Sequence, residues 1–321
     1  MKILITGGTG FLAGRLAYYL KDTGNYQVIL GSRMCVNNNK LKSKFQIVQT
    51  IWNSEAELQL VCKGIDTIIH LAGVNASDSS LDPDLALEFN GIVTGKLLQA
   101  AVKSGVKKFI YFSTAHVYKS PLTGLINEDT LPTSLHPYAI SNRAGEGMVL
   151  SAHNRNEIQG IVLRLSNSFG APVSKDANCW TLLVNDLCKQ VVTSGKMKLT
   201  SSGMQRRNFI AISDVCRVIE HLLKLSFTIK TNNLFNVGSN WSPTVWEMAG
   251  VISQMTKKIL LFEPELIRKK PLSTELTEDL EYNTDRLKST GFVMENNNLE
   301  EISNLLKFCK SNFSFYKNKK S

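Results

Sequence analysis

The sequence predicts an α/β protein with a doubly wound parallel sheet and a smaller, interleaved C-terminal α/β lobe. Strand-like and helix-like segments alternate over residues 1–165, which is the order of a parallel sheet with crossover helices. The strand-like segments are largely apolar, as expected of strands that are covered on both faces. After Arg164 the alternation breaks and Gly, Pro and Asn become frequent, which indicates a second lobe. A length of 321 residues fits roughly two domains.

The individual elements follow from short-range patterns. Segment 66–71 is the clearest buried strand, and segment 85–103 is a long amphipathic helix. Segment 11–20 has helical periodicity and ends near Gly24, a residue suited to a helix C-terminus. Strands are expected at 2–6, 26–30, 45–48, 66–71, 108–112 and 160–165. Helices are expected at 11–20, 55–62, 85–103 and 138–153.

Composition and charge narrow the classes of function. Hydrophobic residues make up 43% of the chain and charged residues 20%, which excludes a disordered chain, a collagen-like repeat and a coiled coil. The formal net charge of +10 suits an anionic ligand, a nucleic acid or a membrane surface, and charge alone does not choose among them. The sequence shows neither a signal peptide nor an apolar run of about 20 residues, so we expect no membrane span.

The cysteines indicate reduced thiols in a cytoplasmic protein. They are too sparse for a disulfide scaffold, and neither a C-x-x-C pair nor Cys/His spacing typical of zinc occurs. We therefore expect no metal site. The six cysteines lie at positions 35, 62, 179, 188, 216 and 309.

A glycine-rich loop joins the first strand to the first helix. Glycines allow a tight turn and close approach to a pyrophosphate, and the helix N-terminus adds N–H donors and a partial positive charge. Strand, loop and helix in this order predict a Rossmann-type dinucleotide site, and the alternative is a turn that binds no ligand. The loop reads Thr6-Gly7-Gly8-Thr9-Gly10-Phe11-Leu12-Ala13-Gly14, with expected cofactor contacts at Gly7, Thr9, Gly10, Phe11 and Leu12.

The end of the second strand favours NADP(H) over NAD(H). NAD-preferring sites usually place Asp or Glu there for the ribose diol, and this chain has Ser32 and Arg33. Arg33 can pair with a 2′-phosphate and Ser32 can donate a hydrogen bond to it, whereas the alternative is a surface arginine without a ligand. We therefore predict a dinucleotide-binding domain and a substrate-binding lobe. The domain comprises 1–165 with a returning segment at about 208–238, and the lobe comprises 166–207 and 239–321.

Further motifs occur along most of the chain. They are Ile69-His70-Leu71-Ala72-Gly73, Phe89-Asn90-Gly91, Ser113-Thr114-Ala115-His116-Val117-Tyr118, Pro137-Tyr138-Ala139-Ile140-Ser141, Arg164-Leu165-Ser166-Asn167-Ser168-Phe169-Gly170, Arg207-Asn208-Phe209-Ile210 and Asn236-Val237-Gly238. From residue 1 to about residue 292, the chain resembles the extended short-chain dehydrogenase/reductase superfamily, specifically its NAD(P)-dependent nucleotide-sugar epimerase/dehydratase family. The resemblance implies further cofactor contacts at Leu71, Ala72, Gly73 and Asn90.

The resemblance also assigns the catalytic positions. In that family a Ser or Thr orients the substrate oxygen, a Tyr exchanges a proton with it, and a Lys four residues later binds the nicotinamide ribose and lowers the tyrosine pKa. Here Thr114 and Tyr138 match the first two, and Asn142 stands at the lysine position. The i, i+4 spacing places Tyr138 and Asn142 on one helix face, about 6 Å apart along the axis.

The replacement of lysine by Asn142 changes the expected chemistry. A Lys⁺ about 4 Å from a phenolate contributes roughly 4 kcal/mol, or about three pKa units, so Tyr138 is expected to titrate near a free tyrosine, at about 10. Arg143 is adjacent but is rotated off the tyrosine face. Oxidation of an alcohol needs tyrosinate and suffers most, whereas reduction of a ketone uses neutral tyrosine. The sequence therefore leaves open an epimerase, a 4-keto reductase and a catalytically impaired binding protein, and it leans away from the epimerase.

The residues that follow Thr114 argue against 4,6-dehydration. Dehydratases of the family carry an acidic pair there, and this chain has Ala115 and His116. His116 is a candidate to contact the substrate as an acid or base, although a histidine packed at a strand end is the favoured interpretation. His70 is expected to be structural.

The resemblance implies a nucleotide-sugar substrate. Asn167 and Arg207 match residues that hold its diphosphate, and Lys270 is expected to help. Arginine recognises phosphates bidentately, so Arg207 is the stronger candidate. The net charge then reflects an anionic cofactor and an anionic substrate, and no nucleic-acid-binding pattern occurs. The family's most frequent setting is glycan precursor synthesis.

A homodimer is the expected assembly. Segments 85–103 and 138–153 carry apolar residues on more than one stripe, which is more than one sheet face needs, and the family resemblance points to the same helices. These residues are Leu85, Phe89, Val93, Leu97, Ala139, Ala144, Met148 and Val149.

Overall fold

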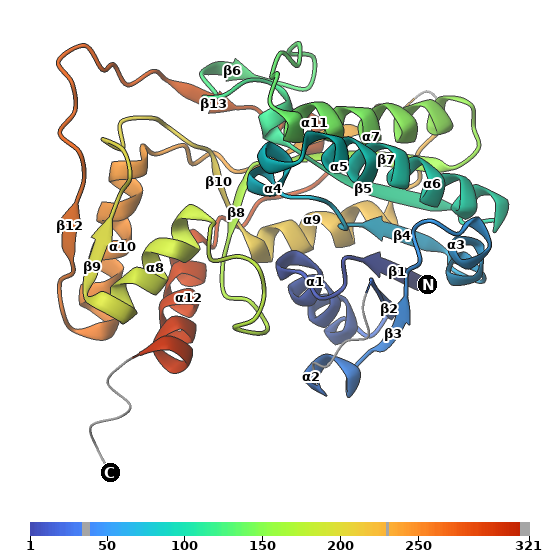
Figure 1. Cartoon of the computed structure of the whole chain (residues 1–321), viewed down its shortest axis with the longest axis horizontal. Coiled ribbons are helices and arrows are strands. Elements are labelled where there is room, and N and C mark those ends of the chain that lie inside the picture. The colour runs from blue at the N-terminus through green and yellow to red at the C-terminus, as the bar shows by residue number, and fades with distance from the viewer. Residues whose placement is uncertain (34–38, 229–230, 315–321) are drawn as a thin grey trace.

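The computed structural model describes residues 1–33, 39–228 and 231–314 and is centred on a seven-stranded parallel sheet (Figure 1). The strand order is β11-β7-β5-β4-β1-β2-β3, and all neighbours pair in parallel. Helices cover both faces, so the predicted doubly wound, Rossmann-type fold is confirmed. The strands are β1 (Lys2–Thr6), β2 (Gln27–Ser32), β3 (Gln46–Gln49), β4 (Thr67–His70), β5 (Lys108–Thr114), β7 (Gln159–Leu165) and β11 (Leu234–Val237).

The strand order reverses at β1, which lies between β2 and β4. The chain winds outward through β2 and β3 on one side, and through β4, β5 and β7 on the other. A crevice for a ligand opens at the carboxyl ends of the strands where such a reversal occurs. The glycine loop after β1 and the segment that begins with Leu71 after β4 both lie at this point.

The strands are apolar because their alternating side chains serve two cores. Ile3 and Ile5 belong to one hydrophobic cluster and Leu4 to the other, and all three are fully buried. Helices α1 and α9 complete the first core, and α3, α6 and α7 complete the second. These helices are α1 (Phe11–Asp22), α3 (Glu55–Cys62), α6 (Thr94–Lys103), α7 (Pro137–Asn154) and α9 (Ile212–Lys224), and the short α2 (Asn39–Lys42) precedes β3.

The predicted single helix at 85–103 is wrong in its detail. Short α4 (Ala76–Leu81) and α5 (Pro83–Leu87) lead into a π-helical turn, η1 (Glu88–Val93), which continues as α6. Because η1 packs against α7, Gly91 leaves no room for a side chain: a Cβ there would lie 3.1 Å from the Ala144 Cβ. Asn90 lies in this π-helical turn, and such turns are frequent at functional sites.

The segments after β7 build a further hydrophobic core of their own. Helices α8 (Leu183–Ser194), α10 (Val245–Leu260) and α12 (Asn298–Phe313) enclose it and lie together at the left of Figure 1. Strand β11 nevertheless returns to the main sheet. The lobe boundaries given above stay a prediction. The remaining elements are β6 (Gly124–Ile126), β8 (Asn167–Phe169), β9 (Lys196–Lys198), β10 (Phe209–Ala211), β12 (Glu265–Ile267), β13 (Leu280–Tyr282), η2 (Ala115–Val117) and α11 (Asp285–Lys288).

An ion pair ties α12 to the first helix. Arg15 of α1 donates to both carboxylate oxygens of Glu301, at 2.7 and 3.1 Å, and Glu301 is almost fully buried. Gly170 makes room for this pair, because a Cβ there would lie 2.5 Å from the Glu301 Oε1 atom. Close packing at this point therefore fixes the C-terminal core against the sheet.

Two further expectations concern thiols and membranes. The five cysteines within the described ranges are free and buried, and Cys35 lies outside those ranges. In the part of the chain that the structure describes, none of the helices is both long enough and apolar enough to cross a bilayer.

Candidate active site

The loop after β1 forms a cradle for an anion. Gly7 has a φ of +67°, and a Cβ on it would lie 3.0 Å from the backbone of Ala72, so only glycine fits. Helix α1 begins at Phe11 with no side-chain cap and no acidic residue in its first turn. Its N-terminal N–H groups are therefore free to meet a phosphate.

A chain of hydrogen bonds holds the floor of this cradle. Thr6 Oγ1 lies 2.7 Å from His70 Nδ1 and accepts from the N–H groups of Leu71 and Ala72, each at 3.2 Å. His70 Nε2 lies 3.0 Å from Thr94 Oγ1, which itself donates to a backbone carbonyl. Burial lowers the pKa of His70 to about 3, so the ring is neutral and joins the two threonines. His70 therefore belongs to the framework, as expected.

Asn90 fixes the opposite wall. Its Oδ1 accepts from the Val74 N–H at 2.7 Å, and its Nδ2 donates to Ser141 Oγ at 3.0 Å. Asn90 is only 3% exposed and faces the cavity. Through these bonds the loop after β4 is tied to the helix that carries Tyr138.

Cradle and wall enclose a cavity of about 300 Å³ at the carboxyl ends of the strands. The structure brings together at this cavity most of the predicted cofactor residues, namely Gly7, Gly10, Phe11, Leu12, Leu71, Ala72, Gly73, Asn90, Tyr138 and Asn142. Sequence reasoning missed Ala13, Val74, Asn75, Tyr111, Phe112, Ser113, Leu165 and Asn178, which also line it. Ser113 belongs to one of the motifs and Asn75 lies two residues after another, so both were open to prediction, whereas Asn178 comes from a distant loop and carried no signal.

Three predicted cofactor residues lie outside this lining. Thr9 is exposed at the tip of the loop and Ser32 is buried at the end of β2. Arg33 is exposed, and its guanidinium carbon lies 5.4 Å from the centre of the Phe89 ring. The aromatic ring thus holds the Arg33 cation beside the end of β2, where a ribose phosphate is expected.

Tyr138 lines the cavity, and Thr114 interacts with its side chain. Thr114 ends β5, Tyr138 opens α7, and their side chains are hydrogen-bonded. Burial raises the pKa of the Tyr138 hydroxyl, and the bond to Thr114 lowers it by less. The expectation that Tyr138 titrates like a free tyrosine is therefore corrected: its pKa is higher because the ring is removed from water.

Asn142 lies one turn further along α7 and contributes no charge. It is 5% exposed; its Nδ2 donates to the Tyr138 carbonyl at 2.7 Å, and its Oδ1 accepts from the Tyr111 hydroxyl at 3.2 Å. Arg143 donates to the Pro132 carbonyl at 2.9 Å and leaves this face. Within the described residues, no cation influences the Tyr138 hydroxyl.

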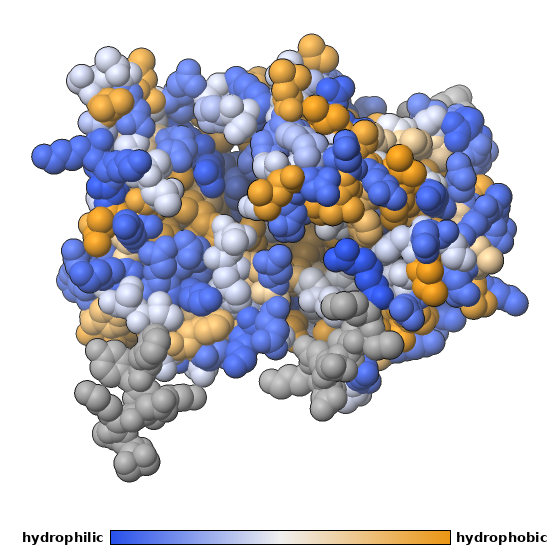
Figure 2. Space-filling model, in the orientation of Figure 1, coloured by the Kyte–Doolittle hydropathy of each residue, from blue (hydrophilic) through white to orange (hydrophobic). Residues whose placement is uncertain are grey.

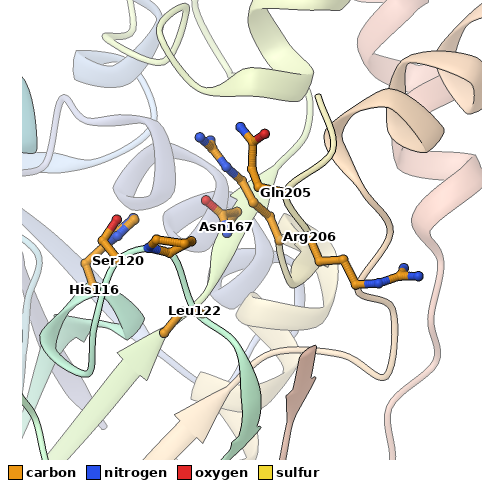
Figure 3. A pocket seen from close by; sticks show the side chains of 8 residues that line it. His116, Ser120, Leu122, Asn167, Gln205 and Arg206 are labelled. Carbon is orange, nitrogen blue, oxygen red and sulfur yellow. The ribbon is translucent and has the colours of Figure 1, made fainter. Parts of the chain in front are cut away.

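A second cavity of about 290 Å³ adjoins Thr114 and Tyr138 through His116. Parallel pairing of β8 with β10 brings Asn167 close to Arg207, and both line this cavity. Figure 3 shows Asn167 near its centre. The lining residues are His116, Ser120, Pro121, Leu122, Asn167, Gln205, Arg206 and Arg207.

The two adjacent arginines have opposite environments. Arg206 points away from His116 and Ser120 in Figure 3, toward Glu247 at 3.4 Å and Asp279 at 3.8 Å. Arg207 is partly buried, and burial alone lowers its pKa, with no carboxylate among the described residues acting on it. A half-buried cation without a counter-ion is a site for an anion. Lys270, by contrast, is exposed and is not among the lining residues.

His116 lines the second cavity and contacts Tyr138, which lines the first. It lies in η2 directly after β5, and its ring meets the Tyr138 ring edge to face, with centroids 6.4 Å apart. Burial lowers the pKa of His116, and the Arg207 cation and the neighbouring His136 lower it further. His116 lines the second cavity and is accessible there, so its role as a substrate contact stays a prediction.

No metal centre accompanies these groups within the described ranges, where His, Cys, Asp and Glu side chains form no cluster of three or more suited to an ion. A proton donor, an anion cradle and a second anion-binding cavity adjoin one another.

The family model for the NAD dependent epimerase/dehydratase family matches residues 3–238, and the chain belongs to this family. The match spans the anion cradle, Thr114, Tyr138 and the Arg207 cavity. The extended short-chain dehydrogenase/reductase assignment is thereby confirmed.

Individual relatives fall into more than one reaction class. The chain is 28% identical over 270 residues to the mouse dTDP-D-glucose 4,6-dehydratase, which covers 80% of this chain and 73% of the relative. It is 25% identical to the UDP-glucose 4-epimerase of Lactobacillus helveticus, covering 74% and 77% of the two chains. The fold matches that of UDP-glucuronic acid 4-epimerase from Bacillus cereus, solved with UDP-glucuronic acid and NAD, with a TM-score of 0.80, 23% identity and coverage of 97% and 99%.

Proposed function

We propose that the chain is a nicotinamide-dependent oxidoreductase that reduces the ketone of a 4-keto nucleotide sugar. The observation that carries this proposal is the environment of Tyr138, whose pKa is raised by burial and which has no cation beside it among the described residues. Such a tyrosine is protonated at neutral pH and is suited to donate a proton. The direction that needs tyrosinate, oxidation of an alcohol, is disfavoured.

The residues divide the chemistry between them. The bound cofactor supplies a hydride to the carbonyl carbon. Tyr138 donates its proton to the carbonyl oxygen, and Thr114 holds that oxygen and the tyrosine in line. Asn142 has one N–H bonded to the Tyr138 carbonyl, and its second N–H is free for the nicotinamide ribose.

The second cavity supports a nucleotide-sugar substrate. Arg207 lacks a counter-ion and Asn167 lies beside it, an arrangement that suits a diphosphate. The named relatives act on UDP- and dTDP-linked sugars. Dehydration is not proposed even though a dehydratase is among them, because Ala115 and His116 replace the acidic pair. The setting we propose is glycan precursor synthesis, in the cytoplasm, where free thiols persist.

For the cofactor we propose NADP(H) over NAD(H). Arg33 is held against Phe89 beside Ser32. The end of β2 carries neither Asp nor Glu, so no negative side chain there repels a 2′-phosphate. The relative from Bacillus cereus was solved with NAD, so the preference proposed here depends on Arg33.

A homodimer through η1, α5 and α7 is also proposed, on only some of the residues first expected. Leu85 and Met148 are exposed, whereas Phe89, Val93, Leu97, Ala139 and Val149 are buried and not available. The apolar residues left exposed on these helices and on α4 are Leu81, Leu85, Leu87, Ile92, Ile140 and Met148. Figure 2 shows hydrophobic residues over α4 and α5 on the visible face. A patch of this kind marks a protein interface.

The decisive experiment incubates the protein with NADPH and a panel of UDP- and dTDP-linked 4-keto sugars, with nicotinamide absorbance and product NMR as readouts. We expect stoichiometric loss of NADPH and a single 4-hydroxy epimer. Interconversion of UDP-glucose and its 4-epimer without net change in the cofactor would show an epimerase instead. Binding of NADPH without any turnover would favour the second candidate, a dinucleotide-binding protein, which Asn142 supports.

A further inference from the structure

His116 occupies a position between the proton donor and the anion site. Its backbone N–H donates to Thr114 Oγ1 at 3.2 Å, which fixes the η2 turn, and His116 lines the second cavity. One side of the ring meets Tyr138. Within the described residues, neither ring nitrogen has a hydrogen-bond partner, so both are available to water or substrate.

The charges that face His116 are all cationic or neutral. Arg207 lies across the cavity, and His136 and Tyr138 lie at the start of α7. His136 is itself held as a cap, with Nδ1 accepting from the Tyr138 N–H at 3.1 Å and Nε2 3.0 Å from Ser80 Oγ. The Arg207 charge opposes protonation of His116, and a diphosphate bound to Arg207 would cancel that charge.

We propose that His116 is a second proton-transfer residue of this site, which returns a proton to Tyr138 and becomes protonated when an anionic substrate binds beside Arg207. The proposal rests on the proposed function, since it requires a nucleotide diphosphate in the second cavity. The side chain of Asn142 has no acidic group that could supply this proton. The proposal therefore assigns the proton supply to His116 in the substrate cavity.

The proposed sequence conserves protons and electrons. A nicotinamide hydride carries two electrons to the ketone carbon, and the Tyr138 proton passes to the ketone oxygen, which leaves a phenolate. Protonated His116 then gives its proton to the phenolate, directly or through one water, and the neutral imidazole takes a new proton from solvent. The net reaction consumes one reduced cofactor, one ketone and one proton.

Proton uptake on binding tests the coupling without requiring turnover. Calorimetric titration with UDP, in two buffers of different ionisation enthalpy at mildly acidic pH, measures the protons bound with the ligand. We expect uptake of up to about one proton per UDP by the wild type. His116→Gln is expected to keep UDP binding and lose most of the uptake. His221→Gln changes a histidine of α9 that bonds to Thr290 Oγ1, and it is the matched control.

The outcomes separate the inference from the function. Equal uptake by wild type and His116→Gln, or no uptake with normal UDP binding, would overturn the role of His116 and leave the substrate class intact. Failure of the wild type to bind UDP or dTDP would instead remove the proposed function and this inference with it.

The rate at which NADPH reduces a 4-keto nucleotide sugar provides the second readout. We expect kcat of His116→Gln to fall by about 10²-fold with NADPH binding unchanged. Added imidazole should restore part of the activity of His116→Ala, because the cavity has room for it, and a merely structural histidine would show no such rescue. Unchanged kcat in His116→Gln would refute the proposal.

Discussion

Two arginines, Arg164 in β7 and Arg207 just before β10, show how this molecule uses charge. Arg164 is 5% exposed, and its guanidinium carbon lies 4.7 Å from the centre of the Tyr118 ring. It donates to both carboxylate oxygens of Glu146, at 2.9 and 2.8 Å. Ser113 donates to the same carboxylate at 2.5 Å. Arg207 faces a cavity and has no carboxylate partner among the described residues. Buried charge is thus compensated where it holds the fold and left open where a ligand is to supply the counter-ion.

The same difference distinguishes the polar groups around the cofactor cavity. His70, Thr6, Thr94 and Asn90 satisfy one another and position the walls. Among the described residues, Thr114 is the hydrogen-bond partner of the Tyr138 side chain, and Tyr138 lines the cavity. We call polar groups open when they face a cavity and closed when other protein groups satisfy them. Substitutions of open groups are expected to change function with little loss of stability, whereas substitutions of closed groups are expected to lower stability.

The largest effect is expected from Tyr138→Phe. The substitution removes the hydroxyl and preserves the ring that packs against His116, so turnover should fall by about 10²- to 10⁴-fold. Steady-state rates measure the loss, and titration with NADPH should give an unchanged dissociation constant. A fully active Tyr138→Phe protein would show that another group protonates the substrate.

The next largest effect is expected from Asn142→Lys. A lysine there would lower the Tyr138 pKa by up to about three units, so oxidation of the 4-hydroxy sugar should rise by up to about 10³-fold and reduction by less. Rate against pH in both directions measures the effect, and the basic limb of the oxidative profile should move to lower pH. The matched control, Asn142→Met, adds bulk without charge and should not accelerate oxidation. A parent enzyme with that limb already well below the range of free tyrosine would contradict the account.

Breaking the closed network should cost stability. Arg164→Met leaves Glu146 buried without its partner, and the free energy of unfolding should fall by about 3–5 kcal/mol. Denaturant unfolding measures it. The double variant Arg164→Met with Glu146→Leu should recover much of the loss, because no buried charge remains. If Arg164→Met alone were as stable as the parent, the closed network would not support the fold.

The elements of this fold were predictable where their signals are local. The apolar runs at 2–6 and 66–71 and the glycine loop between strand and helix specify β1, β4 and the cradle through short-range sterics and periodicity. The π-helical turn at η1 was not predictable, because its close contact with α7 at Gly91 joins segments far apart in the sequence. Apolar stripes also did not separate Phe89, which the fold buries, from Ile92, which stays exposed.

The candidate site was predictable where the family motif places a residue on a regular element. Tyr138, Asn142 and Asn90 meet at one cavity because α7 and η1 pack together. The sequence did not show which of the two adjacent arginines lacks a counter-ion. Arg206 is paired with Glu247 and Asp279, which lie far from it in the sequence. The place of Asn178 likewise depends on a long loop whose path no local pattern encodes.

The neighbouring arginines permit a matched test of the open cavity. Arg207→Met should weaken UDP binding by about 10²-fold, because charge-assisted bonds to a diphosphate are lost, and thermal stability should be unchanged or higher. Arg206→Met removes a cation that is paired with Glu247 and points away, so its effect on UDP affinity should be much smaller. Calorimetry measures both affinities. Equal losses in the two variants would mean that the cavity selects anions by its general field and not through Arg207.

The smallest effect is expected from Arg33, at the edge of the cofactor site. Its cation is held over Phe89 but is exposed, so solvent screens its attraction for a 2′-phosphate. Arg33→Ala should weaken NADPH binding by about 10-fold and leave NADH binding nearly unchanged, and the difference should shrink as salt is added. Fluorescence titration with both cofactors measures the ratio. The control for a general change in charge is Lys21→Ala. Lys21 lies on α1, and its cation is likewise held over an aromatic ring, that of Phe45. A wild-type protein that binds NADH more tightly than NADPH would remove Arg33 from the site, and it would show that aromatic contact alone explains its position.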